Sequence, residues 1–161
     1  MRRRWRLPRL PWPRPRTARG RRWRTGGVAA FLLLLLWWLQ TEPRQSWPHA
    51  QILAAIRQVE SSGRDDVADG DGGKAIGPFQ IHFVYWQDAL RAEPTLGGSY
   101  PDCRRRAYAE RVVVAYMQKY ARDAWANGDA ETIARVHNGG PDGADKQATL
   151  GYWQRVRRHL P

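Results

Sequence analysis

Residues 49–81 read HAQILAAIRQVESSGRDDVADGDGGKAIGPFQI, and this stretch decides the fold. Its first part places Ile52 and Ile56 at the spacing of one helix face, and the run 61–63, Ser-Ser-Gly, ends that helix. The part that follows has few apolar residues. Residues 62–77 hold five Gly and four Asp, which predicts a loop or, at most, a short hairpin.

The rest of the chain predicts more helices. Ser46 is expected to cap the first one, and further helices are expected after Gly77-Pro78, from Ser99 to Pro101 onward, after a capping Asp129, and around Trp153 near the C-terminus. The side chains of the second helical segment expected to reach the core are Phe79, Ile81, Val84, Tyr85 and Ala89. No β alternation and no internal repeat stands out. The predicted class is mainly α, of the α+β kind, with a small Gly/Asp-rich loop or hairpin.

The net charge of +12 first suggests a nucleic-acid-binding protein. However, residues 1–25 carry eleven Arg and no acid, whereas residues 41–161 carry sixteen Lys plus Arg against fifteen Asp plus Glu. The folded part is therefore nearly neutral, and no specific nucleic acid is expected as a partner. A single Cys excludes an intramolecular disulfide framework and a Cys-rich zinc site. Residues 49–161 suffice for one domain, which we expect to be a monomer.

The N-terminal part has the composition of a targeting segment. Residues 1–27 are rich in Arg and Pro and are expected to be disordered, and residues 28–40 are apolar up to Gln40, which predicts one hydrophobic helix. This helix would be a signal anchor or a cleaved signal peptide, and residues 41–48 would be a linker. The domain would then face the periplasm or the cell exterior, tethered to the inner membrane or secreted.

Glu60 is the most informative acid of the chain. It follows the apolar helix and precedes the Gly-rich loop, so core side chains should shield its carboxyl partly and raise its pKa, as a general acid requires. Two carboxyls across a cleft are the minimum for glycoside hydrolysis. Asp71, between Gly70 and Gly72, is the better candidate for the second one, and Asp69 is the alternative. No metal site and no cofactor are expected, since the EF-hand pattern fails and the four His lack ligand spacing.

Two further groups of residues could contact a sugar. The run His137-Asn138-Gly139-Gly140 places polar side chains beside flexible backbone at a helix end, although a helix cap with a buried His would look the same. The pair Tyr85-Trp86 could stack on sugar rings, although aromatic residues at helical spacing also fill cores.

Several segments in order resemble a known family. They are Val59-Glu60-Ser61-Ser62-Gly63, Gly70-Asp71-Gly72-Gly73, Gly77-Pro78-Phe79-Gln80-Ile81, Tyr85-Trp86-Gln87-Asp88, Tyr116-Met117, His137-Asn138-Gly139-Gly140-Pro141 and Gly151-Tyr152-Trp153. Each motif is weak alone, but the ordered set, over about residues 50–158, resembles the invertebrate-type (destabilase-like) lysozymes. The Glu-Ser and Asn-Gly-Gly elements are also similar to lytic transglycosylases, which share the lysozyme-like helical fold.

The resemblance implies hydrolysis of the β-1,4 bond between N-acetylmuramic acid and N-acetylglucosamine in peptidoglycan, the expected partner. It implies Glu60 as the proton donor and Asp71 as the nucleophile or charge stabiliser. The substrate-binding residues that it implies are Gln80, His82, Tyr85, Trp86, Asp88, His137, Asn138, Gly139 and Gly140. Animal members are rich in disulfides, so a chain with one Cys would fit a bacterial member stabilised by its core. The alternatives are a lytic transglycosylase that uses Glu60 alone and a non-catalytic peptidoglycan-binding module.

Overall fold

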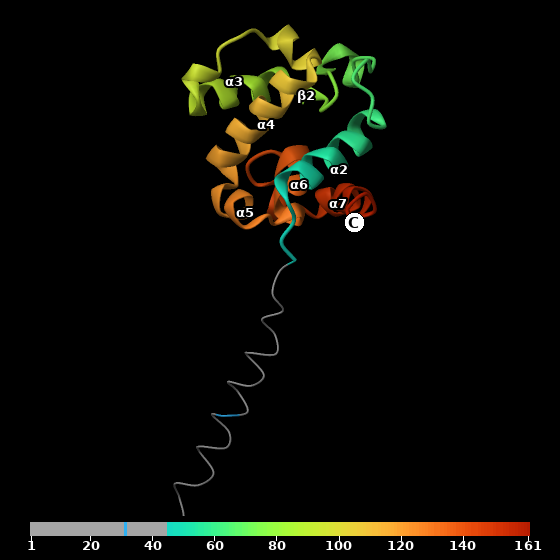
Figure 1. Cartoon of the computed structure of the whole chain (residues 1–161), viewed down its shortest axis with the longest axis vertical. Helices are drawn as coiled ribbons and strands as arrows, with labels where there is room; N and C mark the ends of the chain where they lie inside the picture. Colours follow the sequence, from blue (N-terminus) through green and yellow to red (C-terminus); the bar gives the residue numbers. More distant parts are fainter. Residues whose placement is uncertain (1–30, 32–44) are drawn as a thin grey trace, which may run out of the picture. The chain divides into compact units, whose positions relative to one another are not determined.

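A computed structural model of the chain describes Phe31 and residues 45–161. Its α-helices in the second range are α2 (His49–Ser61), α3 (Phe83–Ala92), α4 (Arg106–Tyr120), α5 (Arg122–Asn127), α6 (Ala130–Gly139) and α7 (Leu150–Arg157) (Figure 1). Two short strands, β1 (Ala75–Ile76) and β2 (Ile81–His82), pair antiparallel. The 3₁₀ turns are η1 (Asp71–Gly73), η2 (Pro94–Leu96), η3 (Tyr100–Arg104), η4 (Gly143–Asp145) and η5 (Gln147–Thr149). The predicted class, mainly α with a small hairpin, is confirmed.

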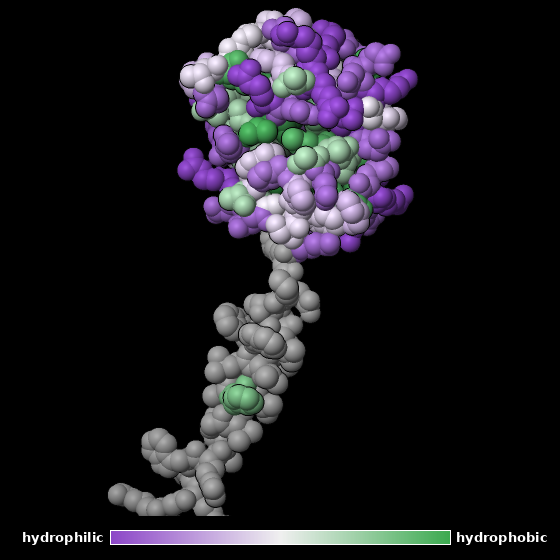
Figure 2. Space-filling model, in the orientation of Figure 1, coloured by the Kyte–Doolittle hydropathy of each residue, from purple (hydrophilic) through white to green (hydrophobic). Residues whose placement is uncertain are grey.

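The elements of residues 45–161 form two groups that share one core. Helix α3 and η3 pack on α4, and the hairpin contacts η3 and α3, while α5 and α7 pack on α6 (Figure 1). Helix α4 also contacts α6, and α2 contacts both α6 and α7. Fully buried apolar side chains come from every one of these groups: Ile52, Ile56, Phe79, Ile81, Val112, Val113, Met117, Ile133, Val136 and Val156. The surface of the domain on the face drawn in Figure 2 is mostly hydrophilic, with apolar side chains gathered in a band across its middle.

Helix α2 ends where the sequence predicts and begins differently. Ser62 adopts the left-handed conformation, with φ of 53°, and its N–H donates to the carbonyl of Arg57, which closes the helix. At the other end, Pro48 is the N-cap residue and no side chain caps the helix. The predicted Ser46 cap is therefore wrong. The chain before Pro48 is held instead by the N–H of Trp47, which donates to the carbonyl of Gly128 at 3.0 Å.

The predicted second helix does not start at Gly77-Pro78. Residues 77–80 form a turn in which the N–H of Gln80 donates to the carbonyl of Gly77 at 2.9 Å. Gly77 has φ of 70°, and a Cβ there would lie 2.1 Å from the backbone oxygen of Cys103, so no other residue fits without a shift of backbone. Helix α3 begins only at Phe83, after strand β2.

The later start changes which side chains reach the core. Phe79, Ile81 and Ala89 are buried as predicted, and Tyr85 is half-buried. Val84 is predicted for the core, but it is 63% exposed and so points to solvent. The reason is that Phe79 and Ile81 belong to a turn and a strand, so the helical phase begins anew at Phe83.

The third predicted helix starts later, whereas the fourth and the last are found where expected. Ser99 and Asp102 form a capping box, but it opens the 3₁₀ turn η3, and α4 begins at Arg106. Asp129 caps α6 through a bond from the N–H of Thr132 at 3.2 Å. Helix α5 was not predicted.

The predictions for residues 1–27 and, apart from Phe31, for residues 28–40 lie outside the described residues, as does the first half of the linker, residues 41–44. Within the described residues, no helix is long and apolar enough to cross a membrane.

Candidate active site

Glu60 lies on the last turn of α2, where the chain leaves the helix for the Gly/Asp-rich loop. Arg57 ties this loop to the helix, because its Nη1 donates to the carbonyl of Gly63 and, at 3.1 Å, to Oδ1 of Asp65. The left-handed Ser62 then turns the chain away from the helix axis. The backbone that carries Glu60 is thus held in place beside a loop that can approach a ligand.

Core side chains shield Glu60 as predicted, since only 18% of its side chain is exposed. Burial raises the pKa of this carboxyl, because desolvation disfavours its charged form. Two groups oppose that rise: the Tyr152 hydroxyl, which donates to Oε1 of Glu60 at 2.6 Å, and the charge of Arg155. The net pKa of Glu60 is raised, which suits a group that must hold a proton near neutral pH.

The Tyr152→Phe substitution is expected to raise the pKa of Glu60 further. The Tyr152 hydroxyl donates to the carboxylate and so favours the ionised form, and phenylalanine cannot donate. A ¹³C NMR titration of the Glu60 carboxyl in the two proteins measures the change. Tyr108→Phe, which removes a hydroxyl bonded to the carbonyl of Gly97, is the matched control and should leave that titration unchanged. An equal or lower pKa in Tyr152→Phe would contradict the assignment.

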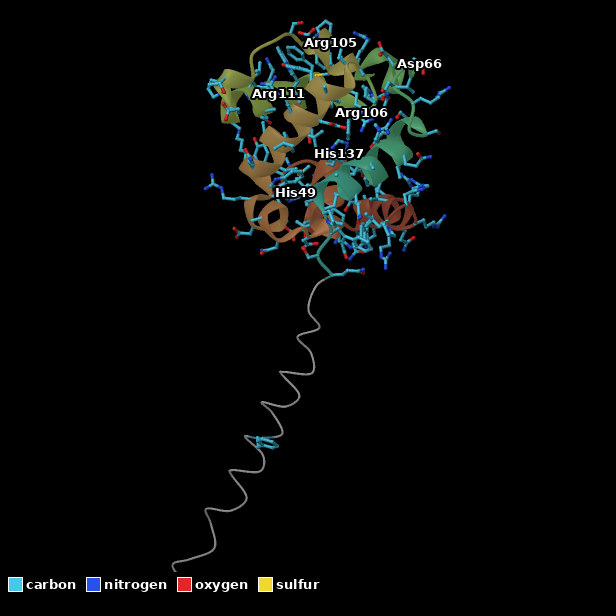
Figure 3. The ribbon with its side chains drawn as sticks, in the orientation of Figure 1. His49, Asp66, Arg105, Arg106, Arg111 and His137 are labelled. Atoms are coloured by element: carbon cyan, nitrogen blue, oxygen red, sulfur yellow. The ribbon has the colours of Figure 1, made fainter. Side chains whose placement is uncertain are left out.

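His137 connects Glu60 to a pair of tyrosines. Its Nε2 lies 3.7 Å from Oε1 of Glu60, and its Nδ1 lies 3.3 Å from the hydroxyl of Tyr85. Tyr85 stacks on Tyr116 with ring centroids 3.6 Å apart. Figure 3 shows His137 near the middle of the domain. Burial lowers the pKa of His137 to about 4, and a hydrogen bond to the backbone of Phe79 opposes this only in part. The imidazole beside Glu60 is therefore neutral near pH 7.

The buried imidazole makes stability depend on pH. Between the folded pKa of about 4 and the ordinary value of 6.5, the unfolded chain binds a proton that the folded one does not, so stability falls as pH falls through this window. From pH 7 to pH 4.5 the loss should be about 2 kcal/mol. Urea unfolding of wild type and His137→Gln at both pH values measures it. The variant should lack this part of the pH dependence, and equal slopes in both proteins would refute the prediction.

Asp71 stands at the tip of a tight loop closed by Gly70 and Ala75. The N–H of Gly70 donates to the carbonyl of Ala75 at 2.8 Å, and the return bond measures 3.1 Å. Asp71 itself has φ of 46°, a conformation that a residue other than glycine adopts at a cost of about 1 kcal/mol or more. Such strain is often found at functional sites. The loop presents the Asp71 carboxylate to solvent, with 63% of the side chain exposed.

A cleft of about 310 Å³ brings the two acids together. Its lining residues are Glu60, Asp71, Ala75, Gln80, Ile81, His82, Tyr85, His137 and Asn138. Nε2 of His82 lies 3.8 Å from Oδ2 of Asp71. The side-chain amide of Gln80 donates to the carbonyls of Gly77 and Ala68, so Gln80 also supports the loop that carries Asp71.

Four predicted substrate-binding residues do not line this cleft. The indole N–H of Trp86 donates to the hydroxyl of Tyr108 at 3.0 Å, and its ring packs against the core. Asp88 is paired with Arg91 at 2.7 Å and with Lys119 at 3.5 Å. Gly139 and Gly140 form the end of α6, which positions His137 and Asn138.

Asp69 and Asp71 have different surroundings. Asp69 is held by Arg104, whose Nη2 donates to Oδ2 at 2.5 Å, and it does not line the cleft. The geometry therefore favours Asp71 over Asp69 as the second carboxyl.

Tyr152 is the residue that sequence reasoning missed. It belongs to a motif of the family resemblance, but its partner Glu60 is 92 residues away, and no spacing rule joins the two. Ala75 and Ile81 line the cleft through the hairpin that was predicted only as an option. Within the described residues, no group of three or more His, Cys, Asp or Glu side chains could hold a metal ion.

Comparisons with known proteins show which family this chain resembles. Residues 49–159 match the family described as Destabilase. Lysozyme 1 of Crassostrea virginica is 38% identical over 109 residues, which cover 66% of this chain and 57% of that protein. A lysozyme of Meretrix lusoria is 37% identical over 108 residues, covering 66% of this chain and 85% of that one.

Solved structures show the same likeness. The inhibitor-bound lysozyme from Meretrix lusoria superposes with a TM-score of 0.56 at 36% identity, over 67% of this chain and 87% of that one. The Tapes japonica lysozyme gives a TM-score of 0.57 at 30% identity with the same coverage.

Proposed function

Because the chain belongs to the destabilase family of invertebrate-type lysozymes, we propose that it hydrolyses the β-1,4 bond from N-acetylmuramic acid to N-acetylglucosamine in peptidoglycan. One observation carries the proposal: Glu60, shielded and with a raised pKa, shares a cleft with the exposed carboxylate of Asp71. Glycoside hydrolysis needs such a pair, one acid that holds a proton and one carboxylate that meets positive charge.

In the first step, Glu60 gives its proton to the glycosidic oxygen, and the bond from that oxygen to the anomeric carbon of N-acetylmuramic acid breaks. Asp71 either bonds to this carbon or stabilises its oxocarbenium-like charge. A water oxygen then bonds to the anomeric carbon, and its proton returns to the Glu60 carboxylate. The hydroxyl of Tyr152 holds that carboxyl by a hydrogen bond. His137 lies beside it and, being neutral, adds no positive charge there.

The substrate named here lies outside the cytoplasmic membrane of bacteria, so the proposal includes export. The apolar run 28–40 after an Arg-rich start is the feature of the sequence that supports this step. Cell fractionation of the full chain expressed in a bacterium tests export, and recovery only from the cytoplasm would contradict it. Mass measurement of the exported protein distinguishes an anchor from a cleaved signal.

The turnover of purified peptidoglycan by the full chain tests the proposed activity. We expect the release of soluble fragments with new reducing ends. Binding to peptidoglycan without any fragment release would instead identify a glycan-binding module. The absence of both would reject peptidoglycan as the ligand.

A further inference from the structure

Within residues 45–161, Arg155 forms no salt bridge, although its charge acts on Glu60. Three other arginines of the domain are held in ion pairs: Arg57 with Asp65, Arg104 with Asp69, and Arg135 with Glu131. Arg155 donates only to the backbone oxygen of Gly151, at 3.3 Å. Residues 146–161 contain no Asp or Glu, so this end of the domain has a local excess of positive charge.

Contacts place Arg155 beside the general acid. Its guanidinium carbon lies 5.4 Å from the ring centroid of Tyr152, and the hydroxyl of Tyr152 donates to Glu60. Its charge lowers the pKa of Glu60. The side chain is exposed, so its guanidinium is open to a ligand, although it does not line the cleft itself.

The chemistry of a guanidinium selects the ligand. Arginine presents a planar set of N–H donors that matches a carboxylate in two parallel hydrogen bonds. Of the two sugars in peptidoglycan, N-acetylglucosamine is neutral, whereas N-acetylmuramic acid bears a lactyl group. That group supplies a carboxylate itself or, when substituted, carries a peptide with free carboxylates. A polymer of N-acetylglucosamine alone offers no such group.

We propose that Arg155 binds a carboxylate on the muramyl side of the substrate and thereby makes the enzyme prefer peptidoglycan over neutral N-acetylglucosamine polymers. The inference rests on the proposed function and names a residue that sets its specificity. Arg155 touches no reacting atom in this scheme, so its removal should change substrate preference and leave the chemical step in place.

The test compares kcat/KM of wild type and Arg155→Gln, in the full chain and at one pH, on three substrates. These are peptidoglycan with stem peptides, peptide-free glycan strands with lactyl carboxylates, and N-acetylglucosamine oligomers. We expect the variant to lose about tenfold on at least one carboxylate-bearing substrate relative to the neutral oligomer. The substrate that is affected shows which carboxylate is bound. Any change in the pKa of Glu60 acts on all three and cancels in the ratio.

Arg122→Gln is the charge-matched control, because Arg122 begins α5, and its Nε donates to the backbone oxygen of Gln118. It should leave the ratio unchanged. Arg155→Lys keeps the charge and should retain part of the preference. An equal loss on all three substrates in Arg155→Gln would overturn the inference.

Binding gives a second readout that needs no turnover. Peptide-free glycan strands should bind Glu60→Gln more tightly than Glu60→Gln/Arg155→Gln, by about the same factor as the loss in kcat/KM. Equal affinities would also overturn the inference. If wild type releases no product although this difference in binding is found, the proposed activity fails while the carboxylate site stands.

Discussion

Replacing Glu60 with glutamine is expected to lower kcat on peptidoglycan by about 10³-fold, the range in which general acid catalysis contributes. Glutamine keeps the size of the side chain and can still accept from the Tyr152 hydroxyl, but it has no proton of suitable pKa to give to the leaving oxygen. Steady-state release of reducing ends measures the effect.

The control for Glu60→Gln is its thermal stability, which shows whether the variant is folded. Because glutamine removes a carboxyl that is costly to bury, the thermal midpoint should stay the same or rise. A folded Glu60→Gln protein with full activity would remove Glu60 from the reaction and with it the proposed mechanism.

The second large effect is expected for Asp71→Asn, a loss of about 10²- to 10³-fold in kcat, comparable to the removal of one group that stabilises charge in a transition state. Asparagine keeps the shape and tolerates the left-handed backbone at this position, where φ is 46°. The loop should therefore stay intact while the negative charge that meets the anomeric carbon is lost.

Asp69→Asn is the matched control on the same loop. Asp69 is paired with Arg104 outside the cleft, so this variant should lose only a partly exposed ion pair, worth about 1 kcal/mol or less, and keep its activity. If Asp69→Asn is inactive and Asp71→Asn is active, Asp69 is the second carboxyl. If both are active, the reaction does not need a second carboxylate.

The sequence predicts the shielding of Glu60 because the signal for it is local. Glu60 follows a helix whose apolar residues are evenly spaced, and the Gly/Asp-rich run after it can only be a loop. Burial of the helix face then implies a shielded carboxyl. The signals for the two ends of α6 are equally local, since Asp129 starts the helix and the glycines after Asn138 end it.

Other features depend on contacts that no local pattern encodes. The apolar residues between Phe79 and Ala89 are expected from the sequence to belong to one helix. Gly77, however, packs against the backbone of Cys103 in a turn, and α3 begins only at Phe83. The bond from Tyr152 to Glu60 joins the two ends of the domain. Trp86 and Asp88 follow Tyr85 on one helix, yet only Tyr85 faces the cleft, because successive helix residues point in different directions.

The products formed from peptidoglycan test the central claim most directly. Mass spectrometry of the fragments released by the full chain distinguishes addition of water from internal ring closure. A two-carboxylate hydrolase should give N-acetylmuramic acid with an ordinary reducing end. Anhydro-muramic ends, each lighter by one water, formed by a protein that keeps its activity as Asp71→Asn, would contradict the account and identify a lytic transglycosylase that uses Glu60 alone.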